Sequence, residues 1–349
     1  MTPFSSHVLD FDAEQTARAL AERLRDAVAR RLRRRGVVVA LSGGIDSSCV
    51  AALSVRALGP DRVFGLMLPE RESSDESLAL AQELARTLGI RYEVREISPI
   101  LEAAGCYRYR DEAVRSVFPE LTPECRWKIV LPGDRLGSAA LNVFSVVVRT
   151  PDGTEHRVRL TPAAYLQIVA ATNFKQRVRK MVEYYHADRL VFACASTPNR
   201  LEYDQGFFVK LGDGAGDVKP IASLYKTQVY RLAEHLGVPA SILARPPTTD
   251  TYSLSQSQEE FYFSVPYSEL DLLLWAKNHD VAPEVAASEM RLSPDQVRRV
   301  YEDIDQKRRT TTYLHASPLL LEEVPEVGPR ARGTGSPVAR RATARSGPA

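Results

Sequence analysis

The sequence predicts an α/β fold, in which helices flank a doubly wound parallel sheet. Short apolar runs alternate with amphipathic segments in the order strand, helix, strand, helix, strand. The first run, Val-Val-Val-Ala-Leu at 37–41, leads through a glycine turn into a helix, which is typical of a buried parallel strand. Ligands of such sheets bind at the carboxyl ends of the strands, so we expect the functional site there.

The turn after this first strand predicts a phosphate-binding loop. It has the sequence Ser42-Gly43-Gly44-Ile45-Asp46-Ser47-Ser48 and opens a helix expected over 47–58. Glycines let backbone N–H groups approach an anion, and the helix N-terminus adds partial positive charge. Because no Gly-Lys-Ser/Thr follows, the loop is not a Walker A motif. It resembles the pyrophosphate loop of the N-type ATP pyrophosphatases, which split ATP into AMP and pyrophosphate. The alternative is an ordinary strand-to-helix turn in which Asp46 only caps the helix.

The other elements follow from periodicity and turn residues. Further parallel strands are expected over 63–68, 91–97 and 189–195. Helices are expected over 12–35, 75–88, 162–185, 225–236, 268–278 and 293–309. The stretch 105–161 breaks the alternation, because the segments 143–148 and 156–160 flank a Pro-Asp-Gly turn. This pattern predicts an inserted β-hairpin.

Composition is that of a soluble globular protein, with 26% charged and 44% hydrophobic residues in 349. The net charge is +2, but residues 327–349 hold five arginines and no acid, which leaves −3 for the rest. We therefore predict one domain over 1–326, with the insertion at about 105–161, and a disordered basic tail over 327–349. A slightly acidic body argues against nucleic acid as the partner. The arginines at 30, 31, 33, 34 and 35 are interpreted as a solvated helix end rather than a nucleic-acid patch.

The four cysteines form no Cys-Xaa-Xaa-Cys pair and no zinc-like spacing with histidine, so they are expected to be reduced. Cys49 and Cys194 are interpreted as core residues rather than nucleophiles. The sequence shows no signal peptide and no run of 18 apolar residues, which predicts a cytoplasmic protein without membrane contact.

Four further motifs, taken together, resemble those of one family. The run 195–202 reads Ala-Ser-Thr-Pro-Asn-Arg-Leu-Glu, and 206–214 reads Gly-Phe-Phe-Val-Lys-Leu-Gly-Asp-Gly. With Asn-Phe-Lys-Gln-Arg-Val-Arg at 173–179 and Pro-Thr-Thr-Asp at 247–250, they resemble the ammonia-dependent NAD synthetases. With the pyrophosphate loop, the resemblance covers most of 35–309. It implies an adenine nucleotide alpha hydrolase-like fold and the ATP-dependent amidation of deamido-NAD to NAD.

The resemblance also implies roles for single residues. Asp46 and Glu202 would hold Mg²⁺, which prefers a few carboxylate ligands together with phosphate oxygens; the alternative for Glu202 is a surface acid. Asp46 and Lys210 would be catalytic. ATP would bind Ser42, Gly43, Gly44, Asp46, Ser47, Ser48, Thr197, Lys226 and Thr248. The dinucleotide would bind Arg177, Lys210, Asp217 and Lys307. Lys175 and Arg179 are weaker candidates, because basic residues on a helix usually face water.

The implied chemistry needs no protein nucleophile. The nicotinate carboxylate attacks the α-phosphate of ATP, and ammonia then displaces AMP from the acyl-adenylate, so the protein positions reactants and neutralises charge. Alternatives are a ligase of the same fold acting on another carboxylate, a tRNA-modifying enzyme with a pyrophosphate loop, and a non-catalytic nucleotide sensor. At the end of the matched region, Gln306-Lys307 replaces the His-Lys common in the family.

The resemblance and the chain's length also suggest partners. Only 36 residues precede the core strand, which leaves no room there for a glutaminase domain. Ammonia is therefore expected to be free or to come from a separate glutaminase partner, for which the inserted hairpin is a candidate docking site. The alternative roles of the hairpin are a lid or a dimer contact. The resemblance implies a homodimer.

Overall fold

The computed structural model describes residues 4–130, 144–246, 252–254, 262, 265–322 and 324. The chain divides into two compact units, Met1–His315 and Ala316–Ala349. The first unit contains every helix and strand discussed below. The predicted domain end after residue 326 and the predicted tail lie outside the described residues.

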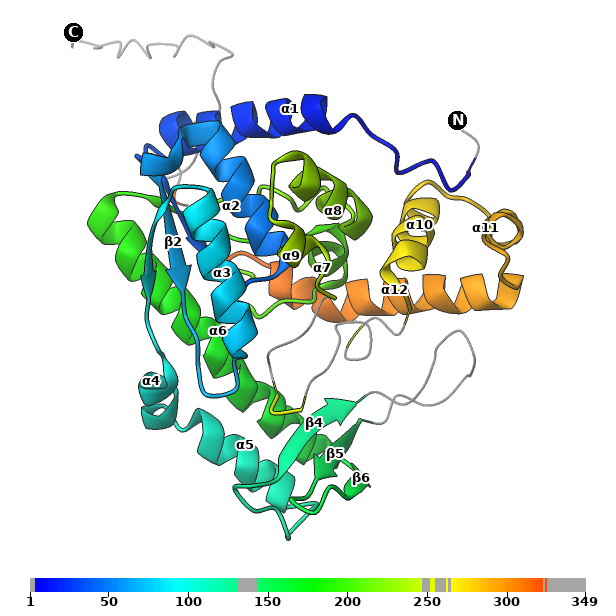
Figure 1. Ribbon diagram of the computed structural model, residues 1–349. Coiled ribbons are helices and arrows are strands. Elements are labelled where there is room, and N and C mark those ends of the chain that lie inside the picture. Colours follow the sequence, from blue (N-terminus) through cyan, green and yellow to red (C-terminus); the bar gives the residue numbers. More distant parts are fainter. Residues whose placement is uncertain are drawn as a thin grey trace, which may run out of the picture. The chain divides into compact units, whose positions relative to one another are not determined.

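A four-stranded parallel sheet forms the centre of the first unit, in the order β3-β2-β1-β7 (Figure 1). Its strands are β1 (Val37–Ala40), β2 (Val63–Met67), β3 (Arg91–Val94) and β7 (Ala193–Ala195). Val37 pairs with Val63 on one side and with Ala193 on the other. The chain order therefore reverses between β1 and β7, and this switch point is where such sheets bind ligands.

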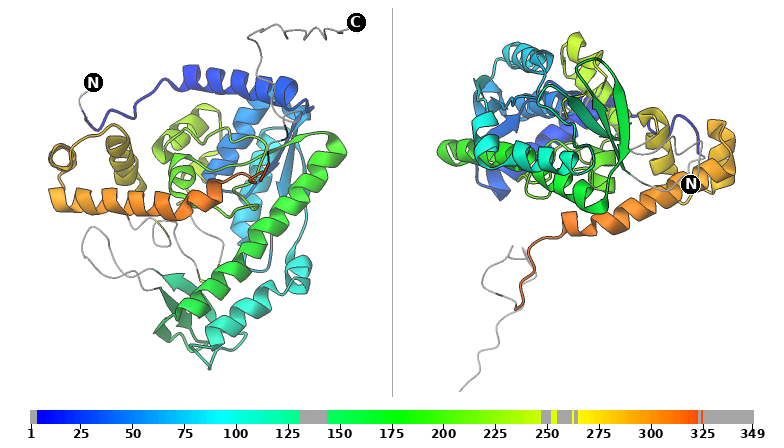
Figure 2. Two further views of the ribbon diagram at one scale, coloured as in Figure 1. Left: turned by 180° about the vertical axis from the view of Figure 1, so that it is seen from behind. Right: turned by 90° about the horizontal axis from the view of Figure 1, so that it is seen from below.

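Helices cover both faces of this sheet, which confirms the doubly wound prediction. Val37 and Val39 of β1 pack in a core with α1 (Ala13–Asp26), α2 (Ile45–Leu58), α3 (Asp75–Thr87) and α8 (Lys226–His235). Val38 points to the opposite core, which contains α4 (Ser98–Ala103), α5 (Cys106–Arg115) and α6 (Pro162–Leu190). Figure 2 shows α6 crossing that face when the molecule is seen from behind. The two cores follow from the period-2 alternation of side chains along a strand.

The predicted fourth strand is wrong in its first residues. Arg189 and Leu190 belong to α6, which ends at Leu190 rather than at the expected residue 185. Val191 adopts a left-handed conformation with φ +57° and ends the helix, so that only Ala193–Ala195 remain as β7. The apolar run 190–195 carries no sequence signal that separates a helix end from a strand start. The helix predicted over 12–35 also differs in the structure, where α1 is followed by a π-helical turn at Ala27–Arg31.

The predicted hairpin is present and is part of a three-stranded antiparallel sheet. β5 (Ser145–Arg149) pairs with β6 (Glu155–Arg159), and the turn contains Gly153 at φ +88°. A third strand, β4 (Arg126–Val130), pairs with the other edge of β5. Residue 143, where we expected the hairpin to begin, lies outside the described residues. Alternate residues of β4 and β5 pack against α5 and α6, so this sheet has its own core.

After β7 the chain forms further helices besides α8. Among them are α7 (Arg200–Gln205), α10 (Tyr267–Asn278), α11 (Pro283–Met290) and α12 (Pro294–His315). The short helices α7 and α11, together with α9 (Ala240–Leu243), were not predicted, and α12 extends beyond the expected end at 309. α10, α11 and α12 share a core with Leu9 from the N-terminal segment.

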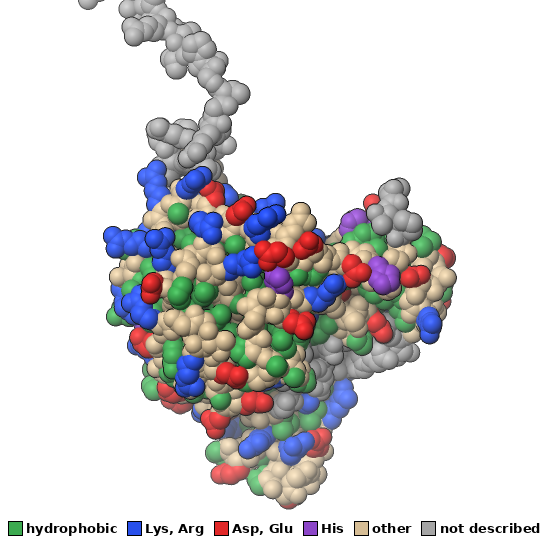
Figure 3. Space-filling view, turned by 45° about the horizontal axis from the view of Figure 1, so that its top comes forward, with side chains coloured by type: hydrophobic (Ala, Val, Ile, Leu, Met, Phe, Trp, Pro, Cys, Tyr) green, Lys and Arg blue, Asp and Glu red, His purple; other side chains and the backbone are tan. Residues whose placement is uncertain are grey.

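The surface mixes charges of both signs, as Figure 3 shows for one face of the molecule. The arginines at 30, 31, 33, 34 and 35 are all exposed. Among the described residues, no helix has both the length and the apolar character that crossing a membrane requires.

Candidate active site

A cavity of about 1080 Å³ opens at the carboxyl ends of the parallel strands. Its walls come from the segments after β1, β2 and β7, from one side of α6 and from the C-terminal half of α12. This volume exceeds that of a typical small-ligand pocket, so there is room for a nucleotide together with a second substrate.

The loop after β1 lies against the start of α3 and leads into α2. Gly43 has φ +75°, and a Cβ placed there would lie 2.3 Å from the carbonyl oxygen of Ser77 at the start of α3. Ser42 Oγ and Ser47 Oγ lie 3.1 Å apart, and Ser47 Oγ donates to the carbonyl of Gly44 at 3.0 Å. Gly44 is the N-cap of α2. The loop therefore presents the helix N-terminus and two hydroxyls to the cavity, which suits phosphate.

Asp46 lies in the first turn of α2 and binds two groups from distant segments. Lys226 Nζ, from the first turn of α8, donates to Asp46 Oδ2. Asn199 Nδ2, from the N-cap of α7, donates to Asp46 Oδ1 at 3.0 Å. The side chain of Lys226 is 1% exposed and that of Asp46 is 15% exposed, so this ion pair is largely buried. Asp271 fixes the start of α8, because its carboxylate accepts the backbone N–H groups of Lys226 at 3.2 Å and Thr227 at 2.8 Å.

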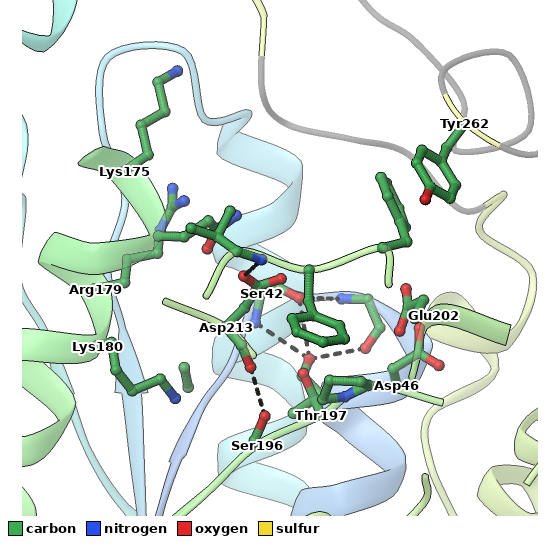
Figure 4. A pocket seen from close by; sticks show the side chains of 18 of the residues that line it. Ser42, Asp46, Lys175, Arg179, Lys180, Ser196, Thr197, Glu202, Asp213 and Tyr262 are labelled. Carbon is green, nitrogen blue, oxygen red and sulfur yellow. Dashed lines mark hydrogen bonds between the residues drawn. The ribbon is translucent and has the colours of Figure 1, made fainter. Parts of the chain in front are cut away.

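Glu202 lies beside this pair and caps α7. It forms a capping box with Asn199, accepting the Asn199 backbone N–H at 3.1 Å. Burial and the neighbouring negative charge of Asp46 raise the pKa of Glu202 to about 8. Figure 4 shows Glu202, Asp46, Thr197 and Ser42 around the same part of the cavity. Two carboxylates thus lie close together where cationic charge would stabilise both.

The opposite part of the cavity contains the cations predicted for the second substrate. Lys210 Nζ donates to the carbonyl of Tyr313 at 2.7 Å and lies 4.1 Å from the centroid of its ring. Arg177 Nε donates to the carbonyl of Lys210 at 3.3 Å and is exposed. Lys307 Nζ is 2.9 Å from Asp303 Oδ2 and 3.0 Å from the carbonyl of Tyr262. These cations converge from α6, α12 and the segment after α7.

Most of the predicted site residues line this one cavity. They are Ser42, Gly44, Asp46, Ser47, Arg177, Thr197, Glu202, Lys210, Lys226 and Lys307. Gly43, in the loop, and Ser48, in the first turn of α2, are not among the residues that line the cavity; Ser48 Oγ donates to the carbonyl of Gly44 at 2.8 Å. Asp217 accepts the backbone N–H of Cys194 at 2.7 Å, next to β7 rather than in the wall. Thr248 lies outside the described residues.

Several residues in or next to the wall were not predicted as site residues. Asn199 is not a lining residue but donates to Asp46, and the pattern Asn-Xaa-Xaa-Glu at 199–202 is a capping-box signature that could have identified it. Arg245 Nη2 donates to Ser77 Oγ at 2.8 Å, and both line the cavity. Lys180 and Glu183 form a buried ion pair at 2.7 Å in the wall. Lys175, which we expected to face water, is buried and pairs with Glu70 at 2.8 Å.

The cysteines agree with the expectation that they belong to the core. Cys49 and Cys194 are both buried with free thiols, and burial raises the pKa of each thiol. A thiol that stays protonated is a poor nucleophile.

The parallel sheet, the glycine loop at a helix N-terminus and the cavity at the switch point define a nucleotide-binding α/β protein. The NAD synthase family model matches residues 16–130 and 149–311. The chain therefore belongs to the NAD synthase family. Residues 131–148 lie between the two matched parts.

Individual relatives agree with this assignment. The NH(3)-dependent NAD(+) synthetase of Mesorhizobium japonicum is 55% identical over 319 residues, which cover 91% of this chain and all of the relative. That of Rhizobium meliloti is 52% identical over 324 residues, covering 93% and 96%. The solved structure of the NH3-dependent NAD synthetase from Campylobacter jejuni has a TM-score of 0.58 at 21% identity, covering 89% of this chain and all of that one. This last likeness shows that the fold is shared.

Proposed function

We infer that the protein is an ammonia-dependent NAD⁺ synthetase, which amidates deamido-NAD at the expense of ATP and releases AMP and pyrophosphate. The observation that carries this inference is the meeting of Asp46, Glu202 and Lys226 beside the phosphate loop, in a chain that shares 55% identity with a synthetase of that name over its full length.

The chemistry requires activation of a carboxylate. A carboxylate oxygen of the nicotinate ring attacks the α-phosphorus of ATP, and the bond from that phosphorus to pyrophosphate breaks. Ammonia then attacks the acyl carbon, loses a proton, and expels AMP as the C–O bond breaks. Both steps develop negative charge on phosphate oxygens, so fixed cations and N–H donors lower both barriers.

Residues around the loop would bind ATP. We propose that the loop 42–48 and the N-terminus of α2 hold its phosphates, with Lys226 as the neutralising cation. Its ammonium group is buried and held by Asp46, so little side-chain freedom is lost when it binds phosphate. Thr197 and, by the family resemblance, Thr248 would hydrogen-bond the nucleotide.

Asp46 and Glu202 would hold Mg²⁺. The donor set fits, because Mg²⁺ is bound in proteins through one or two carboxylates together with phosphate oxygens and water. Bound there, Mg²⁺ would neutralise charge on the phosphates. Asn199 orients the carboxylate of Asp46 through its amide, and its backbone N–H orients Glu202.

The second substrate would lie toward α12. Arg177, Lys210 and Lys307 present cations to the cavity there, and a dinucleotide brings two phosphates that need neutralising. We propose that Lys210 also acts in catalysis by stabilising charge near the reacting carboxylate. Asp217 remains a candidate contact of the dinucleotide, although in this structure its carboxylate binds the backbone of Cys194.

We also propose a homodimer. Met181 and Tyr185 are 56% and 58% exposed, four residues apart on α6, and so lie on one face of a long helix. Sedimentation equilibrium should give a dimer for the wild type and a monomer for the double variant Met181→Glu/Tyr185→Glu. The matched control Val285→Glu changes an equally exposed apolar residue of α11 and should stay dimeric.

The activity is tested by incubating the protein with MgATP, ammonium and deamido-NAD. We expect NAD, AMP and pyrophosphate in equal amounts, and much less product when glutamine replaces ammonium unless a separate glutaminase is added. AMP formation with another carboxylate, such as nicotinate mononucleotide, but not with deamido-NAD would reassign the acceptor. Intact ATP under all these conditions would reject the inference.

A further inference from the structure

A buried network of charges lies outside the residues assigned to either substrate. Glu70 and Glu72 follow β2, and both bind Lys175 Nζ on α6. Arg110 of α5 makes a two-pronged ion pair with Glu72, with both N···O distances at 2.6 Å. Tyr107 Oη donates to Glu70 Oε2 at 2.8 Å. The side chains of Arg110 and Lys175 are each 2% exposed, so the network is enclosed and its formal charges cancel.

This network holds the segment that forms one wall of the proposed ATP site. Pro69, Ser73, Ser74 and Ser77 line the cavity, and Ser77 touches the glycine loop at Gly43. Glu70 closes a turn in this wall, because its backbone N–H donates to Ser73 Oγ at 3.1 Å and its carbonyl accepts from the Ser73 backbone N–H at 2.8 Å. The position of the carboxylates therefore sets the position of the wall.

The network continues into the antiparallel sheet. The Arg110 guanidinium lies 4.8 Å from the ring centroid of Trp127 in β4. The Trp127 backbone N–H donates to Ser253 Oγ at 2.9 Å, and its carbonyl accepts from the backbone N–H of Leu254 at 3.2 Å. The rings of Trp127 and Tyr252 lie 5.3 Å apart, and Tyr252 lines the cavity. Two stretches of cavity wall are thus connected through Arg110 and Trp127.

We propose that Arg110 and Trp127 are positioning residues for the nucleotide, which fix the wall segments 69–77 and 252–254 relative to α6. The antiparallel sheet then serves as an internal support of the active site. The proposal rests on the proposed function only in naming the nucleotide as ATP.

Physical chemistry favours this role over simple stabilisation. A buried ion pair gains little net stability over an apolar pair of the same volume, because both charges are desolvated. A two-pronged Arg–carboxylate pair does, however, allow only one relative geometry of its partners. Loss of that geometry would let the wall move relative to the phosphate loop. A displacement of about 1 Å in a binding site can lower the reaction rate substantially.

The test compares ATP affinity and turnover in the full chain. In Arg110→Gln, we expect the Kd of MgATP by calorimetry and the KM for ATP to rise about tenfold, with kcat and the KM for deamido-NAD within about twofold of wild type. Arg110→Lys keeps the charge without the fork and should give an intermediate rise. Trp127→Phe keeps an apolar ring, so it should fold and raise the Kd about two- to threefold.

Arg149→Gln is the matched control. Arg149 belongs to the same sheet and pairs with Glu155, but both side chains are about half exposed. Its ATP affinity should equal that of wild type. The proposal is overturned if the Arg110 and Trp127 variants have lower melting temperatures but an unchanged Kd at a temperature where all are folded. A different outcome would separate the two proposals. If the wild type binds ATP and the variants weaken this binding as expected, but the wild type makes no NAD, the proposed function fails while the positioning role stands.

Discussion

Lys226 and Asp46 form an ion pair across 180 positions of the chain, between the first turns of α8 and α2. The sequence assigned them to different partners, Lys226 to ATP phosphates and Asp46 to Mg²⁺. In the structure each is the other's counter-ion. On the proposed roles, MgATP would bring a cation for Asp46 and an anion for Lys226, and one set of charge pairs would replace another.

A double-mutant cycle measures this coupling. Lys226→Gln leaves Asp46 and Glu202 without their buried cation, and Asp46→Asn leaves the ammonium without its carboxylate. Each single variant should lose about 2–4 kcal/mol of unfolding free energy, and the double variant clearly less than the sum. Urea unfolding of the four proteins gives the coupling energy. Additivity within about 0.5 kcal/mol would contradict the ion pair.

Glu202→Gln separates the metal role from the capping role. Glutamine at the third helical position can also complete a capping box, so α7 should stay capped and the melting temperature should change little. The Mg²⁺ concentration for half-maximal rate should rise at least about tenfold, because one charged ligand is lost. Glu234→Gln, on the exposed side of α8, is the control. An unchanged Mg²⁺ dependence would remove Glu202 from the metal site.

Gly43→Ala tests the close approach in the phosphate loop. The variant combines φ +75° with a Cβ only 2.3 Å from the backbone of Ser77, so either the loop or α3 has to move. We expect a loss of about 2–4 kcal/mol in unfolding free energy and no measurable ATP binding. Gly153→Ala has a similar φ of +88° but nothing within 4 Å, so it should cost about 1 kcal/mol and leave activity unchanged. Equal effects of the two substitutions would show that backbone strain at positive φ, and not the close contact with Ser77, causes the loss of stability.

The parts of this fold that the sequence predicts are those that depend on local pattern. The run 37–41 and the glycine loop predict a strand, a turn and a helix, because each signal lies within about ten residues. Since the carboxyl ends of parallel strands meet, Asp46 and Glu202 could be placed in one site although 156 positions separate them.

The charge network shows where such prediction ends. Glu70 and Glu72 read as residues of a polar loop, and Lys175 as a basic position of a helix. Arg110 lies in the stretch 105–161, where the sequence pattern predicts no helix. Their burial depends on tertiary packing between α5, α6 and the segment after β2, and no local spacing encodes it. The strand β4 was missed for a related reason, because its pairing partner β5 begins fifteen residues after it ends.

Acid titration gives a direct measure of that network. Two cations, Arg110 and Lys175, oppose the burial penalty of Glu72 and lower its pKa from 4.5 to about 2. Between these values the unfolded chain binds more protons than the folded one, so stability rises with pH there. The ionised carboxylate therefore contributes about 3 kcal/mol at neutral pH, and this contribution is lost as the pH falls from about 5 to about 2. Glu72→Gln cannot titrate, so the stability difference between wild type and variant should shrink by more than half between pH 6 and pH 3. Urea unfolding at intermediate pH values measures this difference. If the difference in unfolding free energy between wild type and Glu72→Gln stays constant with pH, the carboxylate of Glu72 is not ionised inside the network.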